Sequence, residues 1–163
     1  MEIQIIAFKN NISEIVLNGL NIQKKYYIDS DEKFIRNFVD NFKFSDGKGL
    51  VIGLGEYSGR DKEKLRIETI CTNKFRNGVI ALDSEGFKIS NNIKVGSNSK
   101  LAKGIGNSYC NLMSYLFSLK LLSKNIKNEV GFAFIHIPKS FKVEVAIEEI
   151  MGLLSNLMTG SKC

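Results

Sequence analysis

The chain of 163 residues contains a single proline, a single histidine, no tryptophan and three cysteines. The cysteines (Cys71, Cys110 and Cys163) are odd in number and unrelated in spacing, so they form neither a disulfide framework nor a zinc ligand set. We therefore expect reduced thiols. The longest apolar run, Val130 to Ile137, is too short to cross a bilayer, and no export signal is recognisable. These absences predict a cytoplasmic protein without a membrane partner.

The net charge is +6, but its distribution does not favour a nucleic-acid partner. The basic residues are 19 lysines and only 4 arginines. Nucleic-acid surfaces rely on arginine forks and clustered patches, whereas these lysines are scattered along the chain without a block of like charges. We expect a solvated basic surface and no bound nucleic acid, and keep a basic nucleic-acid-binding domain as the last-ranked alternative.

Composition and patterning predict one globular domain over residues 1–163. Hydrophobic residues make up 44% and charged residues 25%, and no linker or repeat divides the chain. Short apolar segments that read as strands alternate with amphipathic segments that read as helices, which predicts an α/β layered domain with a mostly parallel sheet. Strands are predicted at 3–8, 26–28, 50–54, 65–71 and 130–137, a hairpin at 79–82 with 87–89, and helices at 13–19, 32–42, 108–126 and 141–158.

His136 is the only histidine, so any histidine-dependent chemistry must use it. It lies near the end of the predicted strand 130–137, just before Pro138. In open α/β sheets, sites gather at the carboxyl ends of strands, which favours a functional histidine. The alternative is a structural histidine within an apolar stretch.

Cys110 is the second candidate, in the first turn of the predicted helix 108–126. The positive end of the helix dipole lowers the pKa of a thiol placed there and favours the thiolate. The alternative is a small buried hydrophobic side chain, which is common for free cysteine.

Glu68 is a carboxylate inside an otherwise apolar strand. Buried acids are rare unless they have a partner, so Glu68 either has one or lies on a solvent-exposed face with Arg66. A thiol nucleophile needs a base, and the base needs an acceptor that holds its ring. Glu68, Cys110 and His136 could supply these three groups.

Several blocks of sequence, in this order, resemble the pyroglutamyl-peptidase I family of cysteine peptidases. G-E-Y-S-G-R is similar to the family's G-x-x-G-G-R, E-T-I-C-T-N to E-R-V-A-I-N, and L-D-S-E-G to P-D-N-E-G (residues 55–60, 68–73 and 82–86). G-N-S-Y-C-N resembles A-G-x-x-x-C-N, and F-I-H-I-P resembles F-I-H-[IV]-P (residues 106–111 and 134–138). The resemblance implies a three-layer α/β/α sandwich with a mostly parallel, mixed sheet, and an enzyme that needs neither a metal nor a cofactor.

By the same resemblance, Cys110 is the nucleophile, His136 the general base and Glu68 the carboxylate that orients it. The implied reaction removes an N-terminal pyroglutamyl (5-oxoproline) or related small acyl group from a peptide or small amide through a thioester. The implied substrate contacts are Phe8, Glu56, Arg76, Ser108 and Tyr109.

The sequence departs from the family where the substrate would be held. The loop after Phe8 is shorter, Ser108 stands where an aromatic residue is common, and Glu56 replaces a neutral residue. We therefore expect an intact triad beside an altered pocket. The alternative is a non-catalytic relative that binds a small ligand or a partner, with Cys110 buried and slow to alkylate and with Glu68 and His136 more than hydrogen-bond distance apart. A homo-oligomer is also possible, because the helix predicted at 141–158 carries a broad apolar face.

Overall fold

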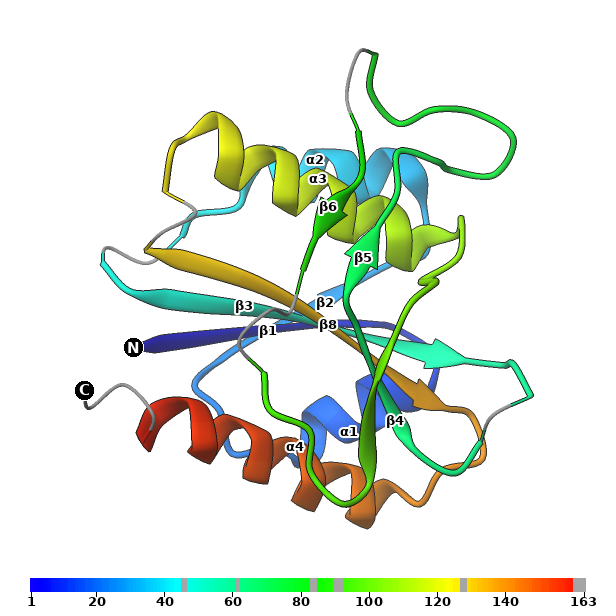
Figure 1. The fold of residues 1–163 in the computed structure, drawn as a ribbon, viewed down its shortest axis with the longest axis vertical. Helices are drawn as coiled ribbons and strands as arrows, with labels where there is room; N and C mark the ends of the chain where they lie inside the picture. Colours follow the sequence, from blue (N-terminus) through cyan, green and yellow to red (C-terminus); the bar gives the residue numbers. More distant parts are fainter. Residues whose placement is uncertain (45–46, 61, 83–84, 90–92, 127–128, 160–163) are drawn as a thin grey trace.

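The computed structural model describes residues 1–44, 47–60, 62–82, 85–89, 93–126 and 129–159, which form a three-layer α/β/α sandwich (Figure 1). The strands of the central sheet are β1 (Glu2–Phe8), β2 (Lys24–Ile28), β3 (Gly49–Tyr57), β4 (Leu65–Glu68), β7 (Ser99–Ala102) and β8 (Val130–Pro138). The helices are α1 (Ile12–Gly19), α2 (Glu32–Asn41), α3 (Tyr109–Ser123) and α4 (Val143–Thr159). Within the described ranges, no helix has the length and apolar character that a membrane span requires.

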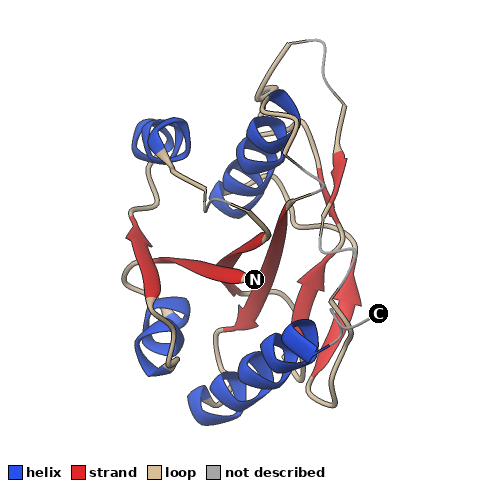
Figure 2. Cartoon of the chain, turned by 90° about the vertical axis from the view of Figure 1, so that its left-hand side faces the viewer, coloured by secondary structure: helices blue, strands red, loops and turns tan. Residues whose placement is uncertain are grey.

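Alternating side chains divide the interior into two cores, one on each face of the sheet. On β1, Ile6 and Phe8 face α2 and α3, whereas Ile5 and Ala7 face α1 and α4. All four are almost completely buried. Such runs of apolar residues on both faces are typical of a strand covered by helices on both sides. Figure 2 shows this layering, with the helices above and below the sheet.

The sheet has the order β2-β1-β3-β8-β4-β7 and is mostly parallel. Strands β2, β1, β3 and β8 run in one direction, while β4 is antiparallel to β8 and parallel to β7. The predicted mixed α/β/α sandwich is therefore confirmed. The antiparallel contact places Arg66 of β4 directly opposite His136, near the carboxyl end of β8.

Two of the strand predictions for the chain after Glu68 were wrong. The predicted strand 65–71 breaks at Thr69: β4 ends at Glu68, and β5 (Ile70–Cys71) pairs antiparallel with β6 (Phe87–Lys88) in a separate small sheet. The predicted partner of residues 87–89, segment 79–82, forms no strand because the Asn73 side chain binds the backbone of residues 80 and 81. Part of the predicted turn, residues 83–84, lies outside the described residues. The short strand β7 was not predicted.

The sequence predicts that the inward face of helix α3 consists of Leu112, Tyr115, Leu116, Leu119 and Leu122, but α3 is rotated from that orientation. Leu112 and Tyr115 are buried as expected, but Leu122 is 45% exposed, while Met113 and Phe117 are fully buried. This rotation is held at the start of the helix by the buried Asn111 side chain, which bonds the backbone of residues 72 and 74. The buried amide therefore fastens the start of α3 to the loop at residues 72 and 74.

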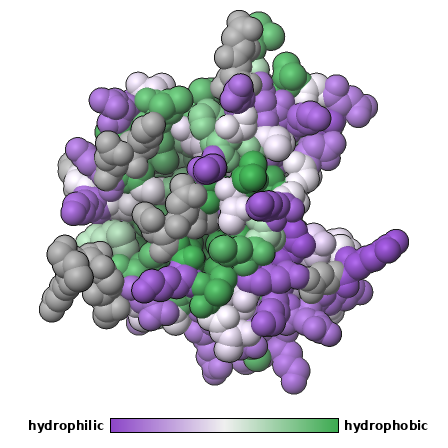
Figure 3. All heavy atoms as spheres, viewed as in Figure 1, coloured by the Kyte–Doolittle hydropathy of each residue, from purple (hydrophilic) through white to green (hydrophobic). Residues whose placement is uncertain are grey.

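An apolar cavity of about 470 Å³ lies between α3, β8 and the end of α4, away from the candidate active residues. On the corresponding face of the molecule, hydrophobic residues reach the surface among hydrophilic ones (Figure 3). The lining of the cavity includes Leu50, Phe87, Leu121, Leu122, Val130 and Leu157. The homo-oligomer expected from the sequence stays a prediction.

Candidate active site

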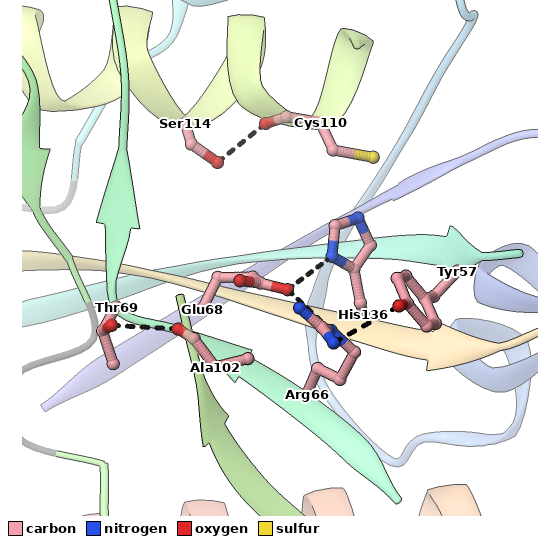
Figure 4. A network of polar contacts seen from close by, with 8 residues as sticks. All are labelled: Tyr57, Arg66, Glu68, Thr69, Ala102, Cys110, Ser114 and His136. Carbon is pink, nitrogen blue, oxygen red and sulfur yellow. Dashed lines mark hydrogen bonds and ion pairs between the residues drawn. The ribbon is translucent and has the colours of Figure 1, made fainter. Parts of the chain in front are cut away.

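His136 and Glu68 meet on the face of the sheet that α3 covers. The Nδ1 atom of His136 lies 2.9 Å from Oε1 of Glu68, within hydrogen-bond distance (Figure 4). Glu68 is fully buried and His136 is 4% exposed. The solvent-exposed alternative for Glu68 is therefore wrong: its charge is buried against the only imidazole and against Arg66, whose Nε lies 3.1 Å from the same oxygen.

Cys110 lies over β3, which is the neighbour in the sheet of β8, the strand that carries His136. A Cβ atom added to Gly55 would come within 2.7 Å of the Cys110 sulfur, so the absent side chain leaves the space that the thiol fills. Gly55 is the register partner of His136 in the parallel β3–β8 pair. In Figure 4 the ring nitrogen of His136 that does not face Glu68 lies on the Cys110 side of the ring. The structure therefore brings the three predicted residues together.

The thiol and the imidazole are close without being joined. Among the residues that the structure describes, no hydrogen bond links the Cys110 thiol with His136. The backbone carbonyl of Cys110 accepts a hydrogen bond from the Ser114 hydroxyl. Catalytic hydrogen bonds are often long in a free enzyme and tighten when substrate binds. The arrangement can therefore support proton transfer once the thiol turns toward the ring.

The backbone at the start of α3 provides donors beside the thiol. Ser108 is the N-cap residue of the helix, but its side chain makes no capping hydrogen bond. The first N–H groups of an α-helix have no partner within the helix. Donors in this position can stabilise an oxyanion that forms next to Cys110.

The pKa of the Cys110 thiol is shifted in the direction opposite to the one the sequence predicted. Burial raises its pKa from 9.0 to about 12, the Ser108 hydroxyl and the backbone of Cys110 oppose this rise, and the charge of Glu68 adds to it. The helix terminus was expected to favour the thiolate. Desolvation of the charged sulfur outweighs that effect, so the resting side chain is a neutral thiol.

We expect Cys110 to react slowly with iodoacetamide at pH 7. Three pH units separate 9.0 from about 12, which lowers the thiolate fraction about a thousandfold. A more basic thiolate is also a better nucleophile, by roughly 20-fold over the same interval, so the net slowing is about 50-fold. Mass mapping of the labelled cysteine measures this rate against an unstructured peptide with the sequence of residues 105–115. A Cys110 that reacts as fast as the peptide would contradict the raised pKa.

Three of the five predicted substrate contacts lie at or beside the start of α3, where Ser108 is the N-cap residue, Tyr109 is the first helical residue and Arg76 lies in a neighbouring loop. Arg76 adopts a left-handed backbone conformation (φ 53°), and its guanidinium bonds the Tyr109 hydroxyl. Backbone and side-chain bonds between Arg76 and Asn107 fasten this loop to the segment before Cys110. Arg76 and Tyr109 line an open groove of about 600 Å³ together with polar residues of α2.

The remaining two predicted contacts are placed differently. Phe8 lies on the same face of the sheet as Cys110 but is only 2% exposed, as part of the core. Glu56 follows Gly55 in β3 and therefore points to the opposite face, where its carboxylate accepts a hydrogen bond of 3.5 Å from the backbone of Ile12 at the start of α1. The structure does not bring Glu56 to the thiol.

Sequence reasoning missed several residues that shape the site. Gly53 and Gly55 leave room for Phe134 and the thiol, a role that only the packing reveals. Arg66 was noted only as a sign of solvent exposure. Its spacing of two residues from Glu68, which places both on one face of a strand, was the available signal. No group of three potential metal ligands occurs among the described residues.

The fold resembles that of known peptidases. Pyrrolidone carboxyl peptidase from Fervidobacterium islandicum AW-1 superposes with a TM-score of 0.79 at 12% identity, covering 98% of this chain and 99% of that one. A mutant of the Pyrococcus furiosus enzyme gives a TM-score of 0.75 at 14% identity, with full coverage of both chains. The Thermococcus litoralis enzyme gives 0.73 at 14% identity, covering 98% of this chain and 96% of that one. No family model matches the sequence, and a search of curated proteins finds no significant match. At these identities the likeness establishes the fold.

Proposed function

We propose that this chain is a cysteine hydrolase that removes an N-terminal pyroglutamyl or related small acyl group from a peptide or small amide. The observation that carries the proposal is the buried 2.9 Å contact between His136 Nδ1 and Glu68 Oε1, on the face of the sheet covered by the helix whose first turn carries Cys110. A carboxylate that holds one ring nitrogen leaves the other available as a base. The solved structures with the same fold are named as pyrrolidone carboxyl peptidases, and the pyrrolidone carboxyl group is the pyroglutamyl group.

The proposed mechanism starts from the neutral thiol. Nε2 of His136 takes the proton from Cys110 as the sulfur attacks the acyl carbonyl, and first-turn N–H groups of α3 stabilise the oxyanion. The imidazolium then gives its proton to the leaving amine, which departs and leaves a thioester on Cys110. Water, deprotonated by His136, attacks the thioester and releases the free acid and the thiol. Neither a metal nor a cofactor takes part.

The substrate would bind between the start of α3 and the ends of β1 and β3. The Arg76–Tyr109 pair borders an open groove at that end of α3, whereas Phe8 is almost completely buried beneath the same face of the sheet. An uncharged, compact lactam needs no counter-ion, which suits a site whose buried carboxylate, Glu68, is already paired with His136 and Arg66. Glu56, on the other face, does not enter this contact.

A non-catalytic relative is the second candidate, and one observation favours it. The raised pKa of Cys110 indicates a thiol that is slow to react, as expected for a protein that has lost its chemistry. The Glu68–His136 contact argues against it, because a buried carboxylate costs free energy and brings an inert relative no catalytic benefit. Slow alkylation alone therefore does not separate the two candidates, whereas turnover does.

The test is hydrolysis of a panel of fluorogenic aminocoumarin amides in the presence of a reducing agent, with Cys110→Ala protein as the blank. The panel compares pyroglutamyl, prolyl, glutaminyl and acetyl amides. We expect the pyroglutamyl amide to be preferred, and rapid acid quenching to reveal a thioester on Cys110 by mass. Turnover of another acyl amide only would keep the mechanism and overturn the specificity. No turnover of any member, with no acyl adduct, would overturn the proposed activity.

A further inference from the structure

Arg66 contacts the same Glu68 oxygen as His136, although the proposed mechanism gives Arg66 no role. It pairs with His136 across the antiparallel β4–β8 contact, so both side chains project to the same face of the sheet. Glu68, two residues further along β4, projects to that face as well. The Arg66 side chain is only 13% exposed, which is unusual for an arginine.

The contacts of Arg66 join two strands around one carboxylate oxygen. Its Nε lies 3.1 Å from Glu68 Oε1, the same oxygen that lies 2.9 Å from Nδ1 of His136. Its guanidinium stacks 4.3 Å above the ring of Tyr57 in β3, and a terminal nitrogen lies 3.4 Å from the Tyr57 hydroxyl. Figure 4 shows this chain from Tyr57 through Arg66 to Glu68 and His136. The guanidinium is thus held in place on a ring while it holds the carboxylate.

The charge of Arg66 determines which group donates in the contact between Glu68 and His136. Glu68 is fully buried, and among the described residues its second oxygen, Oε2, has no hydrogen-bond partner. A buried carboxylate stays ionised only with a counter-charge, and the guanidinium of Arg66 provides it. An ionised carboxylate only accepts hydrogen bonds, so Nδ1 must carry the proton and Nε2 keeps its lone pair.

Without that counter-charge, the direction of the hydrogen bond between Glu68 and His136 can reverse. A protonated Glu68 would donate its proton to Nδ1, and the neutral ring would then carry its own proton on Nε2. An Nε2–H group cannot take the proton of Cys110, so the ring would be in the wrong tautomer for a base. The carboxyl–imidazole distance would stay the same while the direction of the hydrogen bond changed.

We propose that Arg66 is a positioning residue that keeps Glu68 ionised and thereby fixes His136 in the tautomer whose Nε2 accepts a proton. The groups that face the imidazole are Glu68 and Arg66 from β4, Tyr57 from β3 and Cys110 from α3. The consequence for catalysis rests on the proposed function, whereas the tautomer is a property of the folded protein and can be measured without a substrate.

The single histidine makes the tautomer directly observable. In nitrogen-15 NMR spectra, protonated and unprotonated ring nitrogens are clearly distinguished, and only one imidazole contributes. At about pH 8, above the usual titration range of imidazole, we expect wild type to show Nδ1 protonated and Nε2 bare. Arg66→Met and Arg66→Gln should shift the ring to the Nε2–H tautomer. Arg66→Lys, which keeps the charge, should retain the wild-type pattern.

Activity provides the second readout. We expect Arg66→Met and Arg66→Gln to lower kcat by about 10- to 100-fold with KM changed less than about threefold, because Arg66 is largely buried against Glu68 and Tyr57 and acts through His136. Arg66→Lys should recover most of kcat. Arg66→Gln has an amide of similar reach and keeps a donor for Glu68, so it serves as the neutral variant if Arg66→Met does not fold.

The outcomes separate this inference from the proposed function. Neutral variants that fold and still show the Nδ1–H tautomer would overturn the role of Arg66, as would a wild-type protein whose ring carries its proton on Nε2. A tautomer that switches in a protein that hydrolyses none of the amides would support the role of Arg66 and reject the proposed hydrolase.

Discussion

Replacing Cys110 or His136 with alanine is expected to lower kcat by about 10⁴-fold or more on the best amide of the panel. The thiol is the group that forms the thioester, and the imidazole is the only histidine in the chain. Because the resting thiol is neutral, with a pKa of about 12, the sulfur depends on its base more strongly than a preformed thiolate would. Single-turnover kinetics with wild type and each variant measures the loss.

The double variant gives the sharper result. When two residues act on one proton transfer, removing both costs little more than removing either. We therefore expect Cys110→Ala/His136→Ala to match the single variants. Glu68→Gln should cost less, about 10²- to 10⁴-fold, because it leaves the thiol and the ring in place and changes only how the ring is held.

Independent losses that multiply in the double variant would show that Cys110 and His136 do not act together. Thermal unfolding of each variant is the control. The Cys110 residue keeps part of its surface exposed although its sulfur is packed over Gly55, and alanine lacks only that sulfur, so Cys110→Ala should keep the wild-type transition to within about 1 kcal/mol. An active Cys110→Ala protein would overturn the nucleophile outright.

The sequence predicts the framework of this site well because it depends on local patterns. Val130 to Pro138 is a strand buried on both faces, and its position in the sheet places His136 near a carboxyl edge. The run E-T-I-C-T-N led to the wrong prediction of one strand that continues past Glu68, because the pattern of residues does not reveal which sheet a strand joins. The chain leaves the central sheet after Glu68, and Phe87 pairs with Cys71 rather than with the segment that precedes it.

Electrostatic properties of the site were less predictable, because they depend on burial. The position of Cys110 at a helix start indicated a lowered pKa, but the helix lies flat on the sheet and removes the thiol from water. Arg66 and Glu68, read as a pair of charges on one strand face, indicated solvent exposure. The same spacing is compatible with a buried ion pair, and only the neighbours that the fold brings to this face, His136 and Tyr57, decide between the two.

Gly55→Ala is expected to lower kcat/KM by about a hundredfold or more while the protein stays folded. The added Cβ would lie 2.7 Å from the Cys110 sulfur and 2.8 Å from Cζ of Phe134, closer than a methyl group can approach either atom. The thiol is the end of a short side chain and can rotate away, which separates it from His136. A displacement of about 1 Å at a reacting atom costs about 10²-fold in rate. Steady-state kinetics on the pyroglutamyl amide measures the loss.

Gly53→Ala separates displacement of the thiol from general crowding. Its added Cβ would lie 2.5 Å from Phe134 and 2.6 Å from Met113, so it strains the same layer between β3 and α3 without meeting the sulfur. Both variants should lower the free energy of unfolding by about 1–3 kcal/mol in urea titrations. Only Gly55→Ala should lose most of the activity. Equal losses would mean that the strain acts through Phe134, whose ring contacts His136 at a centroid distance of 4.9 Å, and would place the sensitivity in the imidazole rather than in the thiol.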